Sequence, residues 1–312
     1  MKMYAGVTDN SWYSFLAQQG SIDEVNFWHP SGKSPFAKLP EGAPVLFKLK
    51  SPHHHIAGGG FFIKFTSLPL RLAWDVFGQK NGAATFREFE ALIMAARARH
   101  ETKDRDIGCS LISAPFFFPR ESWIPVEDEF PRSGPVTGKY FDTSEPHGRG
   151  IWDAVQSRLS AQLYFETRAA ERPVEFGAPI LLRPRRGQAT FRALVTNAYG
   201  RRCAITGEST LPVLEAAHIK PVSAEGLHNT YNGLLLRSDF HKLFDIGLVT
   251  VTPEHRVLVS SKIKEQWFNG KAYNRLHGER LASLPQAADD HPRADFLRWH
   301  NDNIFERETR SA

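Results

Sequence analysis

Short apolar runs separated by turn-forming residues occupy the first 140 residues of the chain. Residues 45–49 and 60–65 are two such runs, and glycine, proline and polar residues lie between them. This pattern predicts a small, strongly curved β-structure. Residues 11–18 and 86–100 instead repeat apolar positions at helical spacing, so this part of the chain is expected to be mixed β with a few helices.

The pattern becomes helical beyond residue 140. A polar, turn-rich segment precedes an amphipathic helix that is expected to start near Ile151. Phe191, Leu194 and Val195 then recur at three and four residues, which predicts another helix. The expected division is a first domain at 1–145, a helical linker at 146–184 and a second domain at 185–312.

Composition supports two folded domains and narrows the setting. The 312 residues are 41% apolar and 23% charged, which is typical of a globular protein long enough for two cores. A net charge of +5 is compatible with a polyanionic partner but does not demonstrate one. Cys109 and Cys203 are too few for a disulfide framework or a cysteine zinc site, and no apolar stretch is long enough to span a membrane. We therefore expect a soluble cytoplasmic protein.

The residues that indicate chemistry lie between positions 199 and 249. His218 follows a short apolar strand, Asn232 lies in the loop beyond it, and His241 comes next on a predicted helix. A strand, loop and helix in this order can present three side chains to one divalent ion. This set has what phosphodiester hydrolysis requires.

Each of these side chains has a candidate role. A histidine with an ordinary pKa near 6.5 suits removal of a proton from water, so His218 is the candidate general base. His241 and Asp245, at i and i+4, share one helix face and could hold a metal ion that neutralises charge on the phosphate. Asn232 could either hold the loop that orients His218 or approach the metal. Asp245 could instead simply cap the helix end before Gly247.

The segment resembles the HNH, or ββα-metal, endonuclease family, especially its restriction-type branch. The resemblance rests on Glu-Ala-Ala-His-Ile at 215–219 and His-x-x-Phe-Asp at 241–245, and it covers roughly residues 185–305. It implies His218 as base, Asn232 as the middle asparagine and His241 as the last histidine.

The chain departs from many members of that family at two points. An Asp or His often precedes the base and binds the metal, whereas this chain has Ala217 there, so Glu215 or Asp245 is expected to substitute. Cysteine knuckles on a structural zinc are also missing, because Cys203 stands alone. The expected metal set is His241, Asp245 and Glu215, with Mg²⁺ or Mn²⁺ as the first expectation and Zn²⁺ or Ni²⁺ also open.

Basic residues surround this constellation and are candidates for contacts with DNA phosphates. For the arginines the alternative is a solvated helix face, whereas Lys220 and Arg237 lie closer to the catalytic strand and helix. The residues expected to contact DNA are Arg185, Arg186, Arg192, Lys220 and Arg237.

The first domain is similar in outline to the PUA superfamily, whose SRA and EVE branches occur fused to HNH nucleases in modification-dependent restriction enzymes. The similarity rests on the predicted strands, the Gly-rich turn at 57–62 and the aromatic-rich segments at 9–15 and 24–30. It implies a concave pocket that stacks a flipped base on aromatic rings. The ring residues expected there are Trp12, Tyr13, Phe27, Trp28 and His29, and the alternative for each is an ordinary core position.

The expected fold class is therefore α+β, with a PUA-like curved β-barrel followed by a ββα-metal HNH nuclease domain. The expected function is a metal-dependent DNA endonuclease in defence against foreign DNA, acting on DNA that carries a modified cytosine. The alternatives are a catalytically weak HNH-fold DNA-binding protein, or a nuclease on unmodified DNA or RNA. Because cutting both strands needs two sites or two events, a homodimer is expected.

Overall fold

The structure is a computed structural model, and it describes residues 1–33, 35, 39–100, 104–126, 137–169, 187–267 and 270–306. The chain divides into two compact units, Met1–Arg185 and Arg186–Ala312. Each unit has its own hydrophobic core, and the expected mixed α+β class is confirmed. None of the helices in the described ranges combines the length and apolar character needed to cross a bilayer.

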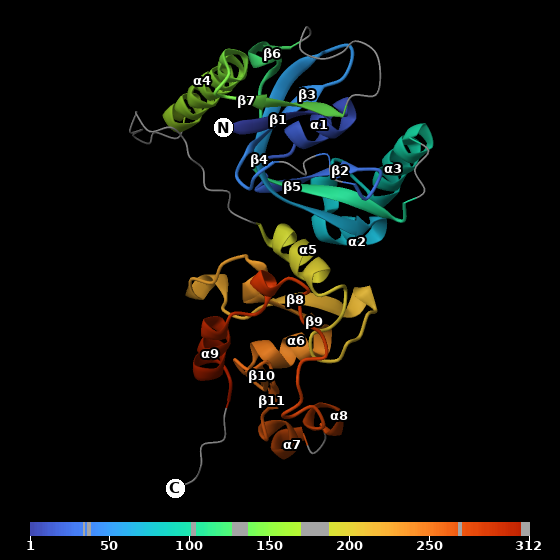
Figure 1. Cartoon of the computed structure of the whole chain (residues 1–312), viewed down its shortest axis with the longest axis vertical. Coiled ribbons are helices and arrows are strands. Elements are labelled where there is room, and N and C mark those ends of the chain that lie inside the picture. Colours follow the sequence, from blue (N-terminus) through green and yellow to red (C-terminus); the bar gives the residue numbers. More distant parts are fainter. Residues whose placement is uncertain are drawn as a thin grey trace. The chain divides into compact units, whose positions relative to one another are not determined.

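The N-terminal unit is built on one mixed sheet in the order β2-β5-β4-β3-β1-β7, with β6 paired to β4 (Figure 1). Only β1 and β3 run parallel, and the other pairs are antiparallel. The strands are β1 (Lys2–Thr8), β2 (Glu24–His29), β3 (Pro44–Leu49), β4 (His55–Pro69), β5 (Asp106–Phe117), β6 (Ile124–Pro125) and β7 (Gly138–Asp142).

The glycines at positions 58–60 allow β4 to approach its neighbours closely. A Cβ on Gly59 would come within 2.7 Å of the Val45 carbonyl oxygen, and one on Gly60 within 3.0 Å of the Ser113 carbonyl oxygen. The register also shifts between Gly59 and Phe61, and a bulge of this kind increases the local twist of a sheet. These glycines therefore serve strand packing and curvature.

Three helices complete the first part of this unit, namely α1 (Asn10–Ala17), α2 (Leu70–Phe77) and α3 (Phe86–His100). The Asp9 side chain caps α1, and Trp12, Tyr13 and Leu16 of that helix are buried in the core. The helices expected at 11–18 and 86–100 are thus present. The amphipathic helix α2 was not anticipated from the sequence.

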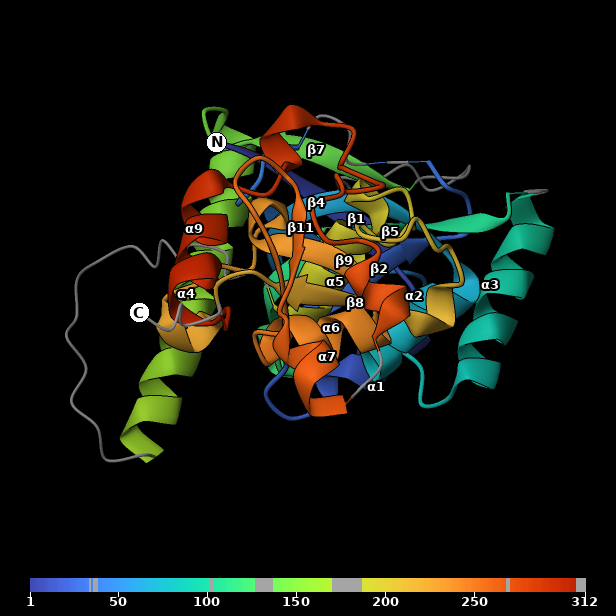
Figure 2. The same cartoon turned by 90° about the horizontal axis from the view of Figure 1, so that it is seen from below.

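Helix α4 (Pro146–Ala169) occupies the first part of the predicted helical linker at 146–184, and the rest of that linker lies outside the described residues. Its Ile151 and Val155 are buried in a cluster with Met3, Leu46 and Ile56 of the sheet. Figures 1 and 2 show α4 and α3 at opposite ends of that sheet. The first turns of α4 therefore belong to the packed N-terminal unit.

The C-terminal unit contains a β-hairpin and a helix in the order that the sequence predicted. One core joins Phe191 of α5 to Leu235 of the hairpin, Phe244 of α6 and Leu297 of α9. The elements are α5 (Gln188–Ala198), β8 (Leu214–His218), β9 (Gly233–Arg237), α6 (Ser238–Asp245), β10 (Val249–Val251), β11 (Val257–Val259), α7 (Lys262–Trp267), α8 (Lys271–Asn274) and α9 (Ala294–Asn303).

Candidate active site

The hairpin and the helix that follows it bring the main candidate residues together. β8 pairs antiparallel with β9, so that His218 lies opposite Gly233 and Glu215 lies opposite Leu236. The chain enters α6 directly after β9, which places His241 on the first turns of that helix. Glu215 and His241 are in hydrogen-bond contact across the two elements, at 2.6 Å.

The ring of His218 is held on two sides. It stacks on Phe191 of α5, with ring centroids 3.8 Å apart and planes inclined by 10°. Its Nε2 shares a hydrogen bond with Nδ1 of His228, at 3.0 Å. Burial, and then repulsion from His228 and His241 when His218 is charged, lowers the pKa of His218 to about 4. The imidazole is therefore neutral at neutral pH and can accept a proton.

The second nitrogen of His218 is open. In the described part of the chain its Nδ1 has no hydrogen-bond partner, and it is not among the buried polar atoms that lack one. His218 as a whole is only partly exposed. Its Nδ1 is thus the ring nitrogen left available for a further contact.

His241 lies between two carboxylates. Its Nδ1 is 2.6 Å from Glu215 Oε2, and its Nε2 is 3.4 Å from Asp245 Oδ2. Burial and the nearby negative charge of Glu215 raise the pKa of Asp245, whereas the charge of His241 opposes that rise. Two acidic groups that repel each other around one imidazole form a site that favours added positive charge.

His218 and His241, which were expected to lie close together, belong to the same ββα unit. No direct contact joins the two rings among the described residues, but the charge of His241 contributes to lowering the pKa of His218. The two imidazoles therefore lie within electrostatic range of each other, on the strand and the helix of one ββα unit.

The donor chemistry of this group fits a divalent cation. Carboxylate oxygens and imidazole nitrogens are ligands for Mg²⁺, Mn²⁺, Ni²⁺ and Zn²⁺. Within the described ranges, however, no three His, Cys, Asp or Glu side chains already converge as a ligand set, and each nitrogen of His241 faces a carboxylate. Fit therefore rests on the kind and charge of the donors.

Asn232 lies beneath the site and holds the loop that joins the two strands. It is fully buried, and its Oδ1 accepts a hydrogen bond from the Lys220 amide at 2.9 Å. Its Nδ2 donates to the carbonyl oxygens of Lys220 and Leu227, both at 2.9 Å. All three contacts are to the backbone of the loop, which matches the loop-holding alternative for this residue.

The candidate active site lies within a segment that matches a known protein family. Residues 203–252 match a family model described as HNH endonuclease, and this segment includes both strands, the loop and α6. Residues 203–252 form an HNH endonuclease domain. No curated protein matches the chain.

Two solved structures are similar to the chain at low sequence identity. The ASCH protein of Zymomonas mobilis is 10% identical, and the alignment covers 48% of this chain and 94% of that one with a TM-score of 0.33. The modification-dependent restriction endonuclease TagI is 13% identical, with 98% of this chain and 84% of that chain covered at a TM-score of 0.29. Scores this low leave the HNH assignment resting on the family match and the site.

The basic residues predicted around the HNH domain have different surroundings. Lys220 Nζ lies 5.7 Å from the centre of the Trp299 ring. The Arg237 guanidinium is bound to both oxygens of Asp239, at 2.7 Å each. Arg192 belongs to α5, and Arg185 and Arg186 lie outside the described residues.

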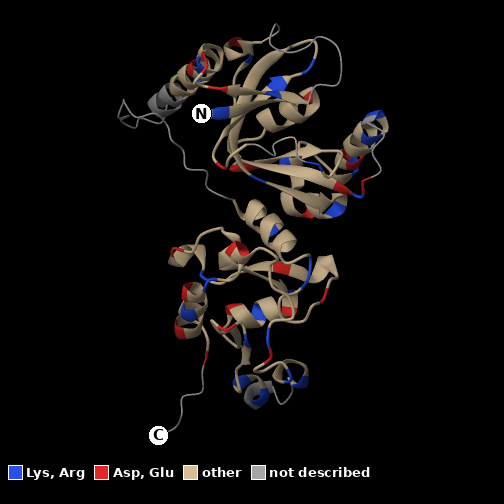
Figure 3. Ribbon diagram, viewed as in Figure 1, with Lys and Arg blue, Asp and Glu red and all other residues tan. Residues whose placement is uncertain are grey.

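Another group of basic residues was not anticipated. Figure 3 shows Lys and Arg gathered on α7 and α8. Lys262 and Lys264 belong to α7, Lys271 belongs to α8, and Arg275 directly follows it. Lys262 is paired with Glu306, whereas Arg275 lines a cavity of about 370 Å³ together with Arg237 and Phe240. This part of the HNH-containing unit is thus more basic than the predicted set implied.

Sequence reasoning also missed His228 and the stacking role of Phe191. His228 lies in the loop between the HNH strands, ten positions beyond His218, and it contacts the candidate base directly. Phe191 was predicted only as an apolar position of a helix, and its ring also covers His218. Loop residues carry no periodicity, so no pattern marked His228 out.

The aromatic residues expected to stack on a base lie mainly inside the N-terminal unit. Trp12, Tyr13 and Phe27 are at most 6% exposed and pack in one cluster, which corresponds to the core alternative. Trp28 and His29 are partly buried, and the Trp28 indole nitrogen donates to the Asn81 carbonyl oxygen. Burial lowers the pKa of His29 to about 4.

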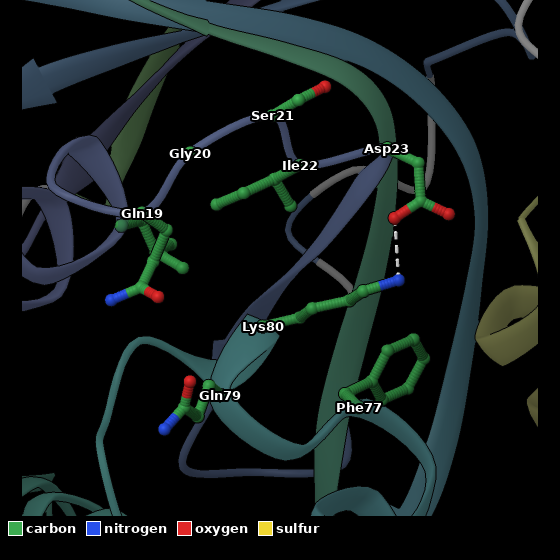
Figure 4. Close-up of a pocket in the computed structure, with 9 residues that line it drawn as sticks. Gln19, Gly20, Ser21, Ile22, Asp23, Phe77, Gln79 and Lys80 are labelled. Carbon is green, nitrogen blue, oxygen red and sulfur yellow. Dashed lines mark hydrogen bonds and ion pairs between the residues drawn. The ribbon is translucent and has the colours of Figure 1, made fainter.

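A cavity of about 390 Å³ lies elsewhere in the N-terminal unit (Figure 4). It is formed where the chain leaves α1 and where it leaves α2, and its lining includes Gln19, Ile22, Phe77 and Gln79. Lys80 Nζ, at its edge, is 2.6 Å from Asp23 Oδ1. None of the five predicted ring residues lines this cavity.

Proposed function

We propose that the protein is a DNA endonuclease that hydrolyses phosphodiester bonds in its HNH domain with His218 as general base. The observation that carries this proposal is the state of His218, whose neutral imidazole presents an open Nδ1 on the same ββα unit as the two carboxylates that face His241. A base and a cation-attracting group on one ββα unit are the two parts that the reaction needs.

The proton movements follow from these positions. A water molecule near Nδ1 of His218 gives its proton to that nitrogen as its oxygen forms a bond to phosphorus. The bond between phosphorus and the leaving oxygen breaks, and the leaving oxygen takes a proton from solvent. Phe191 stacked on the ring holds the plane of the His218 imidazole, and the low pKa of His218 keeps the ring unprotonated beforehand.

His241, Asp245 and Glu215 are the residues that would hold a divalent ion. When bound, such an ion neutralises charge that develops on the phosphate and the leaving oxygen. Without it the two carboxylates would repel the phosphate. We therefore expect activity to require Mg²⁺, Mn²⁺ or a similar cation.

The substrate proposed is DNA with a modified cytosine, selected by the N-terminal unit. This rests on the resemblance of that unit's sequence to base-reading domains and on the presence of a second compact unit in the same chain as the nuclease. Trp28 and His29, the two predicted ring residues that are not fully buried, are the ones left to contact a base. The corresponding role is host defence. Two copies of the protein would together cut the two strands of the DNA.

A DNA-binding protein with little activity is the second candidate. It is favoured by one observation, the pairing of both His241 nitrogens with carboxylates. The departure at Ala217 does not favour it in the same way, because Ala217 is fully buried in the core and a ligand side chain there would face the interior.

Cleavage assays separate these candidates. Purified protein is incubated with unmodified, 5-methylcytosine and 5-hydroxymethylcytosine DNA, with Mg²⁺ or Mn²⁺ and with a chelator. We expect cutting of a modified substrate that the chelator abolishes and that His218→Ala reduces at least about a hundredfold, the low end for a general base. His255→Asn, at a positive-φ turn position that asparagine tolerates, is the matched control.

The outcomes have distinct meanings. Equal cutting of all three DNAs would remove the modification proposal and leave the nuclease. Cutting by His218→Ala at the native rate would remove His218 as the base. Binding of DNA without cutting under any of these ions would establish the second candidate.

A further inference from the structure

We infer that His228 is the positioning residue for the base, fixing both the tautomer and the ring orientation of His218 through their shared hydrogen bond. This inference rests on the proposed function, because it concerns how the same nuclease site is set up. It adds a residue that neither the sequence motif nor the family match singles out.

First, the hydrogen bond between His218 and His228 determines where each ring carries its proton. The bond between His218 Nε2 and His228 Nδ1 is 3.0 Å long and contains one proton, which one of the two rings supplies. If His228 supplies it, then neutral His218 carries its own proton on Nδ1 and cannot accept another there. A base at Nδ1 therefore requires that His218 donates from Nε2 and that His228 accepts at Nδ1.

The second step is ring orientation. The stack on Phe191 fixes the plane of the His218 ring, but a half-turn about the bond to the ring would preserve that stack. Such a turn would move Nε2 away from His228 and point a carbon where the open nitrogen now lies. The two rings are 4.9 Å apart and inclined by 68°, and their contact selects one of the two orientations.

The third step is the anchoring of His228 itself. His228 lies between Leu227, whose carbonyl oxygen accepts from buried Asn232, and Asn229, whose carbonyl oxygen accepts from the Asn232 amide. The same asparagine bonds Lys220, two residues after His218. Asn232 thus ties the backbone of both histidines together, and this explains how a loop residue can position the base.

When His218 takes up a proton, the arrangement remains satisfied. The ring then carries protons on both nitrogens, with the proton on Nε2 still donated to His228 Nδ1. The proton from water stays on Nδ1 until solvent removes it. His228 needs no direct contact with the substrate for this role.

The first test measures the tautomer without any assay of cleavage. In protein with isotope-labelled histidine, two-bond proton–nitrogen correlations report which nitrogen of each ring is protonated, with His218→Ala used for assignment. We expect a proton on His218 Nε2 and an unprotonated Nδ1 on both rings at neutral pH. A proton on His228 Nδ1 would overturn the inference whether or not the protein cuts DNA.

The second test compares two replacements of His228. His228→Phe keeps a ring but removes the acceptor, whereas the side-chain oxygen of His228→Asn can take the place of Nδ1. We expect the phenylalanine variant to lose about tenfold in kcat, part of the contribution of a general base, at a KM within about twofold of the native value. The asparagine variant should recover to within about threefold of native kcat.

Other results would contradict the inference. Native kcat in both variants would show that His228 positions nothing. An equal loss in both, with unchanged thermal unfolding, would show that the acceptor atom is not what matters. His255→Asn again serves as the matched histidine replacement outside the loop.

Discussion

At the scale of single residues, the site is organised by what surrounds each histidine. His218 is neutral because it is partly buried beside two other imidazoles. His241 instead faces two carboxylates, which favour a cation beside it. One unit thus contains a proton acceptor and a cation-attracting group, and the difference arises from their neighbours rather than from the residue type.

Asp245 offers the sharpest test of the cation-attracting group. Asp245 is the last residue of α6, before Gly247, so its role could be limited to ending the helix. Its carboxylate nevertheless faces His241. Asp245→Asn keeps the size and removes the charge. We expect the concentration of Mn²⁺ or Mg²⁺ that gives half-maximal cleavage to rise about tenfold, the lower range for loss of a group that supports a metal site.

The control for this prediction is Asp302→Asn, an exposed carboxylate on α9. It should leave the metal titration unchanged. If Asp245→Asn also leaves the titration unchanged, Asp245 is a helix end and the cation is held by other groups.

At the scale of elements, the hairpin and α5 must fit closely for the base to be covered. Gly233 lies opposite His218 in the ladder, and the Tyr199 hydroxyl donates to its carbonyl oxygen. A Cβ at this position would lie 2.5 Å from Val195 Cγ2 and 3.0 Å from two atoms of the Phe191 ring. The missing side chain therefore lets α5 rest directly on the strand.

Gly233→Ala should accordingly push α5 away from the hairpin. We expect a loss of about 1 to 3 kcal/mol in the free energy of unfolding, typical of an overpacked core. Cleavage should also fall, because Phe191 would no longer stack on His218. Urea unfolding and the cleavage rate are the measurements.

Gly150→Ala is the comparison for this change. Gly150 lies in α4 with no atom near the position of an added Cβ, so alanine there should leave stability equal or slightly raised. Native stability and cutting in Gly233→Ala would show that α5 can shift without cost and that Phe191 is not needed over the base.

Some elements could be predicted from the sequence because a single physical signal determines them. The strand, loop and helix around His218 and His241 follow from apolar runs and motif order, and α1, α3 and α5 follow from helical spacing. Whether an aromatic ring lies in the core or in a base-binding pocket could not be predicted in this way. Trp12 and Phe27 have the composition of a base-binding pocket and also of a core, and only their packing against Phe47 distinguishes the two.

At the scale of the whole molecule, both units contain histidines that folding keeps neutral. Burial lowers the pKa of His29 in the N-terminal unit, and of His218 and His300 in the C-terminal unit, to about 4 in each case. Unfolded histidine has a pKa near 6.5, so between these values the unfolded chain binds more protons. The contribution of these neutral histidines to the free energy of unfolding is therefore present above pH 6.5 and is lost as the pH falls towards 4.

His300 allows this acid sensitivity to be measured at one position. It is 2% exposed, stacks on Phe244 at 3.7 Å, and has its Nε2 3.1 Å from the carbonyl oxygen of that residue. Because His300 stays neutral in the folded protein, its protonation in the unfolded chain should make the C-terminal unit about 2 kcal/mol less stable at pH 5 than at pH 7.

His300→Gln keeps a side-chain N–H near the position of Nε2 but does not titrate. Urea unfolding at pH 7, 6 and 5 should therefore show a smaller loss for this variant than for the native protein. Because His29 belongs to the other unit, the transition of the N-terminal unit should keep its native pH dependence in His300→Gln. The same pH dependence in both proteins for the C-terminal transition would mean that His300 is already protonated, or exposed, in the folded state at pH 5.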